Sequence, residues 1–90
     1  MPSVELLGYG DEQGSKLEIA LRDALVDLDF RDEIIFIRYR SRISDFQNNE
    51  QSYLRVCTRN EEKANILMQR LKRFADVEFI KAANLVMKSG

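Results

Sequence analysis

Pro2 is the residue of this 90-residue chain with the most distinctive chemical use. Removal of Met1 would leave its nitrogen as a secondary amine at the N-terminus. The α-amino group at the N-terminus of a protein has a reference pKa of about 8, and burial or nearby cations lower that pKa further. Such an amine suits a general base that works near neutral pH. The alternative is that Pro2 only follows the initiator methionine and has no chemical role.

Arginine is the second residue type that could form a functional site, because it recurs at alternate positions in two predicted strands. One face of residues 33–43 would carry Phe36, Arg38, Arg40 and Arg42, and the other Ile35, Ile37, Tyr39 and Ile43. In the next strand Leu54 and Val56 alternate with Tyr53, Arg55, Cys57 and Arg59. The apolar sets belong under helices. We therefore expect five arginines, with Phe36 and Tyr53 among them, on the uncovered face of a sheet.

Three interpretations of this arginine-rich face compete. It is a solvated surface whose arginines pair with Glu5 and Glu78 on neighbouring strands. Alternatively it is a subunit interface formed by Phe36, Arg38, Arg40, Arg42, Tyr53 and Arg55, since arginine and tyrosine are favoured there. The third interpretation is a nucleic-acid surface. The net charge of −1 argues against it, so we expect at most weak binding that is indifferent to base sequence.

Composition limits the function classes. Ninety residues, 44% hydrophobic with a single proline, predict one globular domain over residues 1–90. The absence of histidine excludes His-based catalysis, and a single cysteine, Cys57, excludes an internal disulfide and a tetrahedral zinc site. The sequence has neither a signal-peptide pattern nor an apolar run of membrane-spanning length. We expect a cytoplasmic protein with no cofactor, metal or membrane partner.

The predicted elements alternate as β-α-β-β-α-β. Strands are expected at residues 3–9, 33–43, 52–58 and 77–82. Apolar stripes predict two helices, the first beginning at Asp11 or with a Ser15–Glu18 capping box, and the second capped by Asn60. This order predicts an α/β two-layer sandwich (α+β class), a four-stranded sheet with two helices on one face. The sheet is either tautomerase-like, from paired βαβ units, or ferredoxin-like, and the two differ in strand order.

The N-terminal third resembles the tautomerase superfamily. Pro2 precedes a strand that ends in glycine, and "GYGDEQ" (residues 8–13) then leads into an amphipathic helix, as in the small 4-oxalocrotonate tautomerases. The double βαβ order is similar to that of the macrophage-migration-inhibitory-factor-like members. Only Pro2 matches a family site residue, because Tyr9 stands where small tautomerases usually carry arginine, and Ile34 and Ile35 stand where their second-strand arginine lies.

The resemblance implies an isomerase that uses Pro2 as the general base in cofactor-free enol–keto proton transfer on a small 2-oxo acid. Cations would hold the substrate carboxylate and the enolate. If the two halves run antiparallel, Arg59, Lys81 and Asn84 lie at the Pro2 end, whereas Arg38 and Arg40 reach Pro2 better from a neighbouring subunit. We expect a homo-oligomer, a trimer or a dimer, joined through the uncovered face. The alternative function is a non-catalytic ferredoxin-like module that oligomerises or binds an anionic partner through its arginines.

Overall fold

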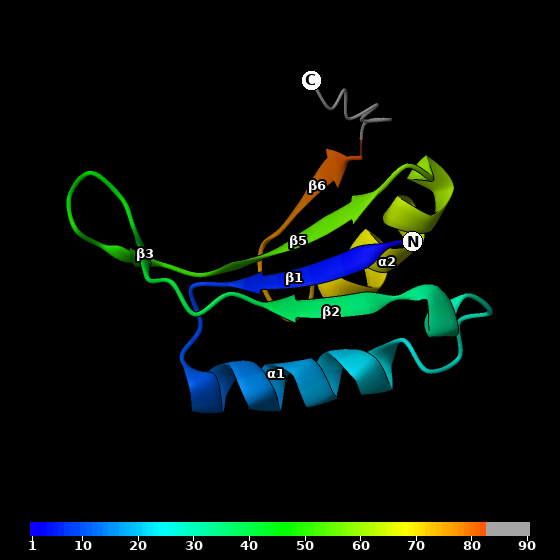
Figure 1. Cartoon of the computed structure of the whole chain (residues 1–90), viewed down its shortest axis with the longest axis horizontal. Coiled ribbons are helices and arrows are strands. Elements are labelled where there is room, and N and C mark those ends of the chain that lie inside the picture. The colour runs from blue at the N-terminus through cyan, green and yellow to red at the C-terminus, as the bar shows by residue number, and fades with distance from the viewer. Residues whose placement is uncertain (83–90) are drawn as a thin grey trace, which may run out of the picture.

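Two βαβ units make up the structure, a computed structural model that describes residues 1–82 (Figure 1). The first unit consists of β1 (Ser3–Leu7), α1 (Asp11–Ala24), the short 3-10 helix η1 (Arg31–Glu33) and β2 (Ile35–Arg38). The second consists of β5 (Tyr53–Thr58), α2 (Glu61–Leu71) and β6 (Val77–Lys81). Between them lie the two-residue strands β3 (Ile43–Ser44) and β4 (Glu50–Gln51). The predicted α/β two-layer sandwich of a four-stranded sheet and two helices is confirmed.

The main sheet has the strand order β2-β1-β5-β6. β1 pairs directly with β2 in parallel and β5 pairs directly with β6 in parallel, while β1 and β5 pair antiparallel at the centre. A ferredoxin-like sheet is a split βαβ, in which another strand separates the parallel pair. The ferredoxin-like alternative is therefore wrong, and the paired βαβ arrangement is the one the chain adopts.

Both helices cover the same face of the sheet. Their apolar stripes supply Leu21 from α1, Leu25 at the C-terminal cap of α1, and Ala64, Leu67 and Leu71 from α2. These side chains pack against Val4, Leu6, Leu54 and Val56, all from even positions of the central strands and at most 1% exposed. Side chains at odd positions of the same strands point to the other side. We call that uncovered side the open face.

The N-termini of the two helices differ in how they are capped. The side chain of Asn60 accepts a hydrogen bond of 3.0 Å from the backbone N–H of Lys63, so the predicted cap of α2 is confirmed. α1 begins at Asp11 after Gly10, which has no side chain to cap it, so of the two predicted starts Asp11 is confirmed and the Ser15–Glu18 capping box is wrong. No helix within residues 1–82 is long and apolar enough to cross a membrane.

The two faces of β2 are the reverse of those predicted. Phe36 is level with Val4 and Arg38 with Leu6, so both lie on the helix side, and Phe36 packs on the core. Ile35 and Ile37 are on the open face instead. The cause is tertiary, because α1 offers partners that alternation does not reveal: Arg22 lies 4.4 Å from the centre of the Phe36 ring, and Glu18 pairs with Arg38.

The chain leaves the sheet after β2 and forms a hairpin that projects from the body, at the left of Figure 1. We call residues 40–52 the arm. Its strands pair antiparallel, and Asp45 closes its turn by accepting backbone hydrogen bonds from Gln47 and Asn49. Strand β2 therefore ends at Arg38, and the single strand predicted over residues 33–43 is wrong beyond that point. Arg40 and Arg42 belong to the arm and not to the sheet.

Candidate functional site

Pro2 lies immediately before β1, a central strand, and its side chain is among the most buried, with less than 2% exposed. Its carbonyl accepts a hydrogen bond of 3.0 Å from the backbone N–H of Ile35. Met1, which is attached to the nitrogen of Pro2, is 84% exposed. The Pro2 ring is therefore anchored in the fold, directly next to an exposed Met1.

The ends of β5 and β6 lie beside Pro2. Ser3 pairs with Cys57, so one step further along this antiparallel ladder Pro2 is opposite Thr58. Thr58 in turn pairs with Lys81. Neighbouring strands are about 4.8 Å apart, which puts Lys81 two strands, or roughly 10 Å, from Pro2. Arg59, which follows Thr58, is at the same end of the sheet, and Asn84 lies outside the described residues.

Lys63 and Glu33 also belong to this end, and the sequence reasoning missed both. The Lys63 ammonium lies 2.9 Å from a carboxylate oxygen of Glu33. This hydrogen bond and the charge of Lys63 lower the pKa of Glu33, and the N-terminal ammonium lowers that pKa further. Glu33 therefore lies within electrostatic range of both Lys63 and the ammonium of Met1. Position alone could have indicated Lys63, since the first turn of α2 follows the strand that ends beside Pro2.

A cavity of about 340 Å³ lies beside Lys63, between the end of α1 and the start of α2. Phe30, Asn60 and Ile66 also line it, and the Lys63 ammonium is 5.2 Å from the centre of the Phe30 ring. The volume falls within the range that small-molecule sites occupy, although Pro2 is not among the lining residues. The acids Asp27, Asp29 and Glu62 line the cavity as well, so its one cation and its apolar side chains stand beside three carboxylates that oppose an anionic ligand.

Arg38 and Arg40 lie at the opposite end of the sheet. Arg38 is level with Leu6, four residues and roughly 13 Å along the strand from Pro2. Both arginines line a second cavity, of about 630 Å³, at the start of α1. Each already contacts an acid that lines the same cavity: Glu18 is 3.3 Å from Arg38, and Asp11 is 3.9 Å from Arg40. Within one chain these arginines and Pro2 do not form a common site.

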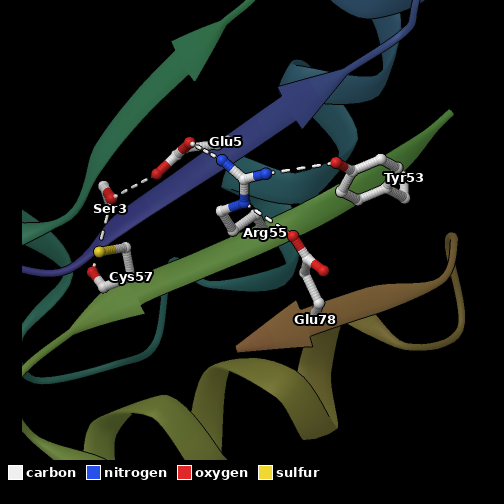
Figure 2. Close-up of polar contacts among 6 residues, drawn as sticks. All are labelled: Ser3, Glu5, Tyr53, Arg55, Cys57 and Glu78. Atoms are coloured by element: carbon white, nitrogen blue, oxygen red, sulfur yellow. Dashed lines mark hydrogen bonds and ion pairs between the residues drawn. The ribbon is translucent and has the colours of Figure 1, made fainter. Parts of the chain in front are cut away.

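The open face carries a charge network centred on Arg55 (Figure 2). Its guanidinium donates hydrogen bonds of 2.8 Å to Glu78, 3.4 Å to Glu5 and 3.2 Å to the hydroxyl of Tyr53. These acidic partners raise the pKa of Arg55. Glu5 is only 7% exposed although no helix covers it. The expected pairing of a face arginine with Glu5 and Glu78 is present, with Arg55 as the arginine.

Glu5 has two further partners on the open face. Ser3 donates a hydrogen bond of 3.3 Å to its carboxylate. The hydroxyl of Tyr39, just after β2, also hydrogen-bonds to Glu5, which raises the pKa of Tyr39. The network thus joins three strands around one buried carboxylate. We interpret it as an arrangement that fixes the neighbouring side chains of the face.

The predicted arginine-rich interface needs correction. Of its six residues, Tyr53 and Arg55 lie on the open face, whereas Phe36 and Arg38 are on the helix side and Arg40 and Arg42 are in the arm. Arg42 pairs with Glu50 across the hairpin at 3.0 Å. In the strands of the sheet the open face carries one arginine against two carboxylates. That balance removes the pattern that motivated the nucleic-acid interpretation.

Comparison with solved structures shows a shared fold. The chain is similar to the crystal structure of a domain of unknown function (DUF1904) from Sebaldella termitidis. The two are 18% identical with a TM-score of 0.55, over 91% of this chain and 87% of that chain. No protein-family model and no curated protein matches the sequence. At this level of identity the likeness concerns the fold alone.

Proposed function

We propose that this protein is a tautomerase-like isomerase that transfers a proton between the enol and keto forms of a small 2-oxo acid. The amine of Pro2, free once Met1 is removed, is the general base. The observation that carries the proposal is the register of the sheet, which sets Pro2 at the end where β5 and β6 finish and where Lys63 and Lys81 lie. No cofactor enters the reaction.

Each group has a defined part in the proton transfer. The Pro2 nitrogen accepts a proton from the carbon next to the carbonyl, so that a C–H bond breaks and an N–H bond forms. The electron pair of that C–H bond moves toward the carbonyl oxygen, and the proton returns to the other end of the enolate. Lys63 and Lys81 are paired with Glu33 and Glu61 in the structure, and they would exchange these partners for the substrate carboxylate and for the negative charge that develops on oxygen.

The surroundings of Lys63 favour a substrate with an apolar side group. Phe30 and Ile66 line the same cavity, and such a wall accommodates an aromatic or branched 2-oxo acid better than a strongly polar one. Phenylpyruvate combines the required carboxylate, 2-oxo group and aromatic ring. We therefore expect it to be a substrate for the enol–keto exchange.

The test is the rate of phenylpyruvate ketonisation by a chain that begins at Pro2. Pro2→Ala should lose most of the activity, because a primary amine replaces the secondary one. Lys63→Met should raise KM more than it lowers kcat, and Lys16→Met, which removes an exposed lysine of α1, should change neither. Circular dichroism of each variant separates loss of activity from loss of fold. Equal rates for the wild type and Pro2→Ala would rule out Pro2 as the base.

A non-catalytic interaction module is the second candidate, and the burial of Pro2 favours it. A proline ring with less than 2% exposure is accounted for by packing alone. In that case the open face, with Arg55 and two carboxylates, is the functional surface. The kinetic test separates the two candidates, because the module would leave the uncatalysed ketonisation rate unchanged.

A further inference from the structure

The cavity of about 630 Å³ at the start of α1 takes no part in the proposed proton transfer. Tyr9 and Gly10, which follow β1, and Tyr39 and Arg40, which follow β2, line it. These parallel strands both end at this edge of the sheet, with the helix that joins them alongside. In open α/β sheets, ligands bind in the crevice outside the carboxyl ends of the strands. The volume is also that of a small-molecule site.

The ion pairs around this cavity leave one positive charge in excess. Glu18 pairs with two arginines, because one carboxylate oxygen lies 3.3 Å from Arg38 and the other 3.0 Å from Arg22. Asp11 pairs with Arg40. Three arginines therefore share two carboxylates, and a ligand with a single negative charge would balance the set.

Arg40 is the cation best placed to take such a ligand. Its guanidinium lies 3.9 Å from the Asp11 carboxylate, which is too far for a hydrogen bond. The two side chains are 87% and 83% exposed, and exposed pairs of this kind contribute little energy. Glu12, the next acid of the helix, is paired with Lys16 at 3.3 Å. A carboxylate on a ligand can therefore replace Asp11 at Arg40 at little cost.

Two glycines keep the cavity open beside these arginines. A Cβ at Gly10 would meet no atom within 4 Å. A Cβ at Gly14 would lie 3.5 Å from the stem of Arg38, so the absence of a side chain there leaves room for this arginine against the helix. The start of α1 has no side-chain cap, and its partial positive charge adds to that of the arginines.

Aromatic rings supply the apolar part of the lining. Phe36 and Tyr9 both pack on the core and also line the cavity. The Tyr9 hydroxyl has a hydrogen-bond partner in Ser52, and the Tyr39 hydroxyl has one in Glu5. The rings of the two tyrosines, and not their hydroxyls, are therefore what the cavity offers to a ligand. Apolar walls with a few placed polar groups are typical of small-molecule sites.

We propose that this cavity binds a small aromatic carboxylate, with the carboxylate on Arg40 and the ring against Phe36 and Tyr9. Arginine matches the geometry of a carboxylate, because its guanidinium donates two parallel hydrogen bonds. The ligand needs no 2-oxo group, since the contacts involve only its carboxylate and its ring. Binding is independent of the proposed catalysis, because Pro2 lies at the opposite end of β1 and is not part of the lining.

Titration with 3-phenylpropanoate tests the proposal, because this probe has the carboxylate and the ring but no 2-oxo group that could react. The backbone amide signals of Gly10, Gly14 and Arg40 should shift in the NMR spectrum as the probe is added. The neutral amide 3-phenylpropanamide, which has nearly the same shape, should cause no such shifts. Shifts confined to Lys63 and Asn60 would place the probe in the other cavity and overturn the proposal.

Two variants should change the affinity for 3-phenylpropanoate in opposite directions. Arg40→Met should weaken binding about tenfold through loss of a charge-assisted contact. Asp11→Asn should tighten it about threefold, because it frees Arg40 from its exposed pair. Arg42→Met is the matched control, since Arg42 is equally exposed, is paired with Glu50 and does not line the cavity.

The opposite signs separate a binding site from general loss of stability, which would not tighten binding. Equal affinity of the wild type and Arg40→Met would overturn the proposal, and so would weaker binding by Asp11→Asn.

Discussion

Replacing Arg55 with methionine tests whether the open-face network stabilises the fold. The substitution keeps an apolar stem but removes the guanidinium, which donates hydrogen bonds to Glu5, Tyr53 and Glu78. Glu5 would keep its contacts with Ser3 and Tyr39 but lose its cation. The loss should destabilise the protein, because a nearly buried carboxylate would remain without charge compensation.

The size of the expected loss of stability follows from how exposed Glu5 and Arg55 are. Removing one partner of a fully buried ion pair costs about 3–5 kcal/mol. Here the Glu5 side chain is 9% exposed, but Arg55 is 25% exposed and the contact is 3.4 Å long. Solvent screening and the remaining hydrogen bonds reduce the expected loss to about 2 kcal/mol in the free energy of unfolding.

Urea denaturation at pH 7 measures this loss, with Arg42→Met as the control. Arg42 also pairs with one acid, at 3.0 Å, but its side chain is 89% exposed, so its removal should change the unfolding free energy by less than about 0.5 kcal/mol. Measurements at two protein concentrations separate folding from assembly. The reasoning is refuted if Arg55→Met and Arg42→Met have the same stability.

Three further changes probe the fold. Gly8→Ala should cost more than about 1 kcal/mol in unfolding free energy, because Gly8 has a φ of +85° and a Cβ there would lie 2.1 Å from the Gln51 carbonyl oxygen. Gly10→Ala is the control, because a Cβ at Gly10 meets no atom within 4 Å, and it should be tolerated. Asn60→Ala should cost about 1 kcal/mol by removing the cap of α2, which thermal unfolding can measure, and an unchanged midpoint would contradict that role. The hydrogen bond from Arg70 lowers the pKa of Asp27, so ionised Asp27 stabilises the fold above about pH 4, and this stabilisation is lost as the pH falls through the folded-state pKa. The difference in unfolding free energy between the wild type and Asp27→Asn should therefore close in acid. A difference that is constant with pH would refute this role of Asp27.

The sequence was sufficient for the order of the main-sheet strands and the two long helices, and for most of the core. Helical spacing identified both apolar stripes, and alternation in residues 53–58 correctly placed Leu54 and Val56 under the helices. These signals are local and strong, because a central strand has one plainly apolar face. The cap of α2 at Asn60 was equally predictable, since a capping side chain followed by two acids is a local sequence pattern.

Alternation could not predict which face of β2 lies against the helices, because both faces of this edge strand contain apolar residues. Phe36 and Arg38 find Arg22 and Glu18 on α1, and these partners are 14 and 20 positions away in the chain. The site residue Lys63 was missed for the same reason, since its contact with Glu33 joins positions 30 apart. The arm was missed because its exposed residues continue the strand-like alternation beyond Arg38.

The mass of the intact protein, isolated from its native source, tests the proposed role of Pro2 most directly. A general base at the Pro2 nitrogen requires a free amine, so the mass should correspond to the chain without Met1. N-terminal sequencing of the same sample should begin at Pro2. A protein that retains Met1 has an amide nitrogen at Pro2, which cannot accept a proton near neutral pH, and that result would contradict the proposed catalysis.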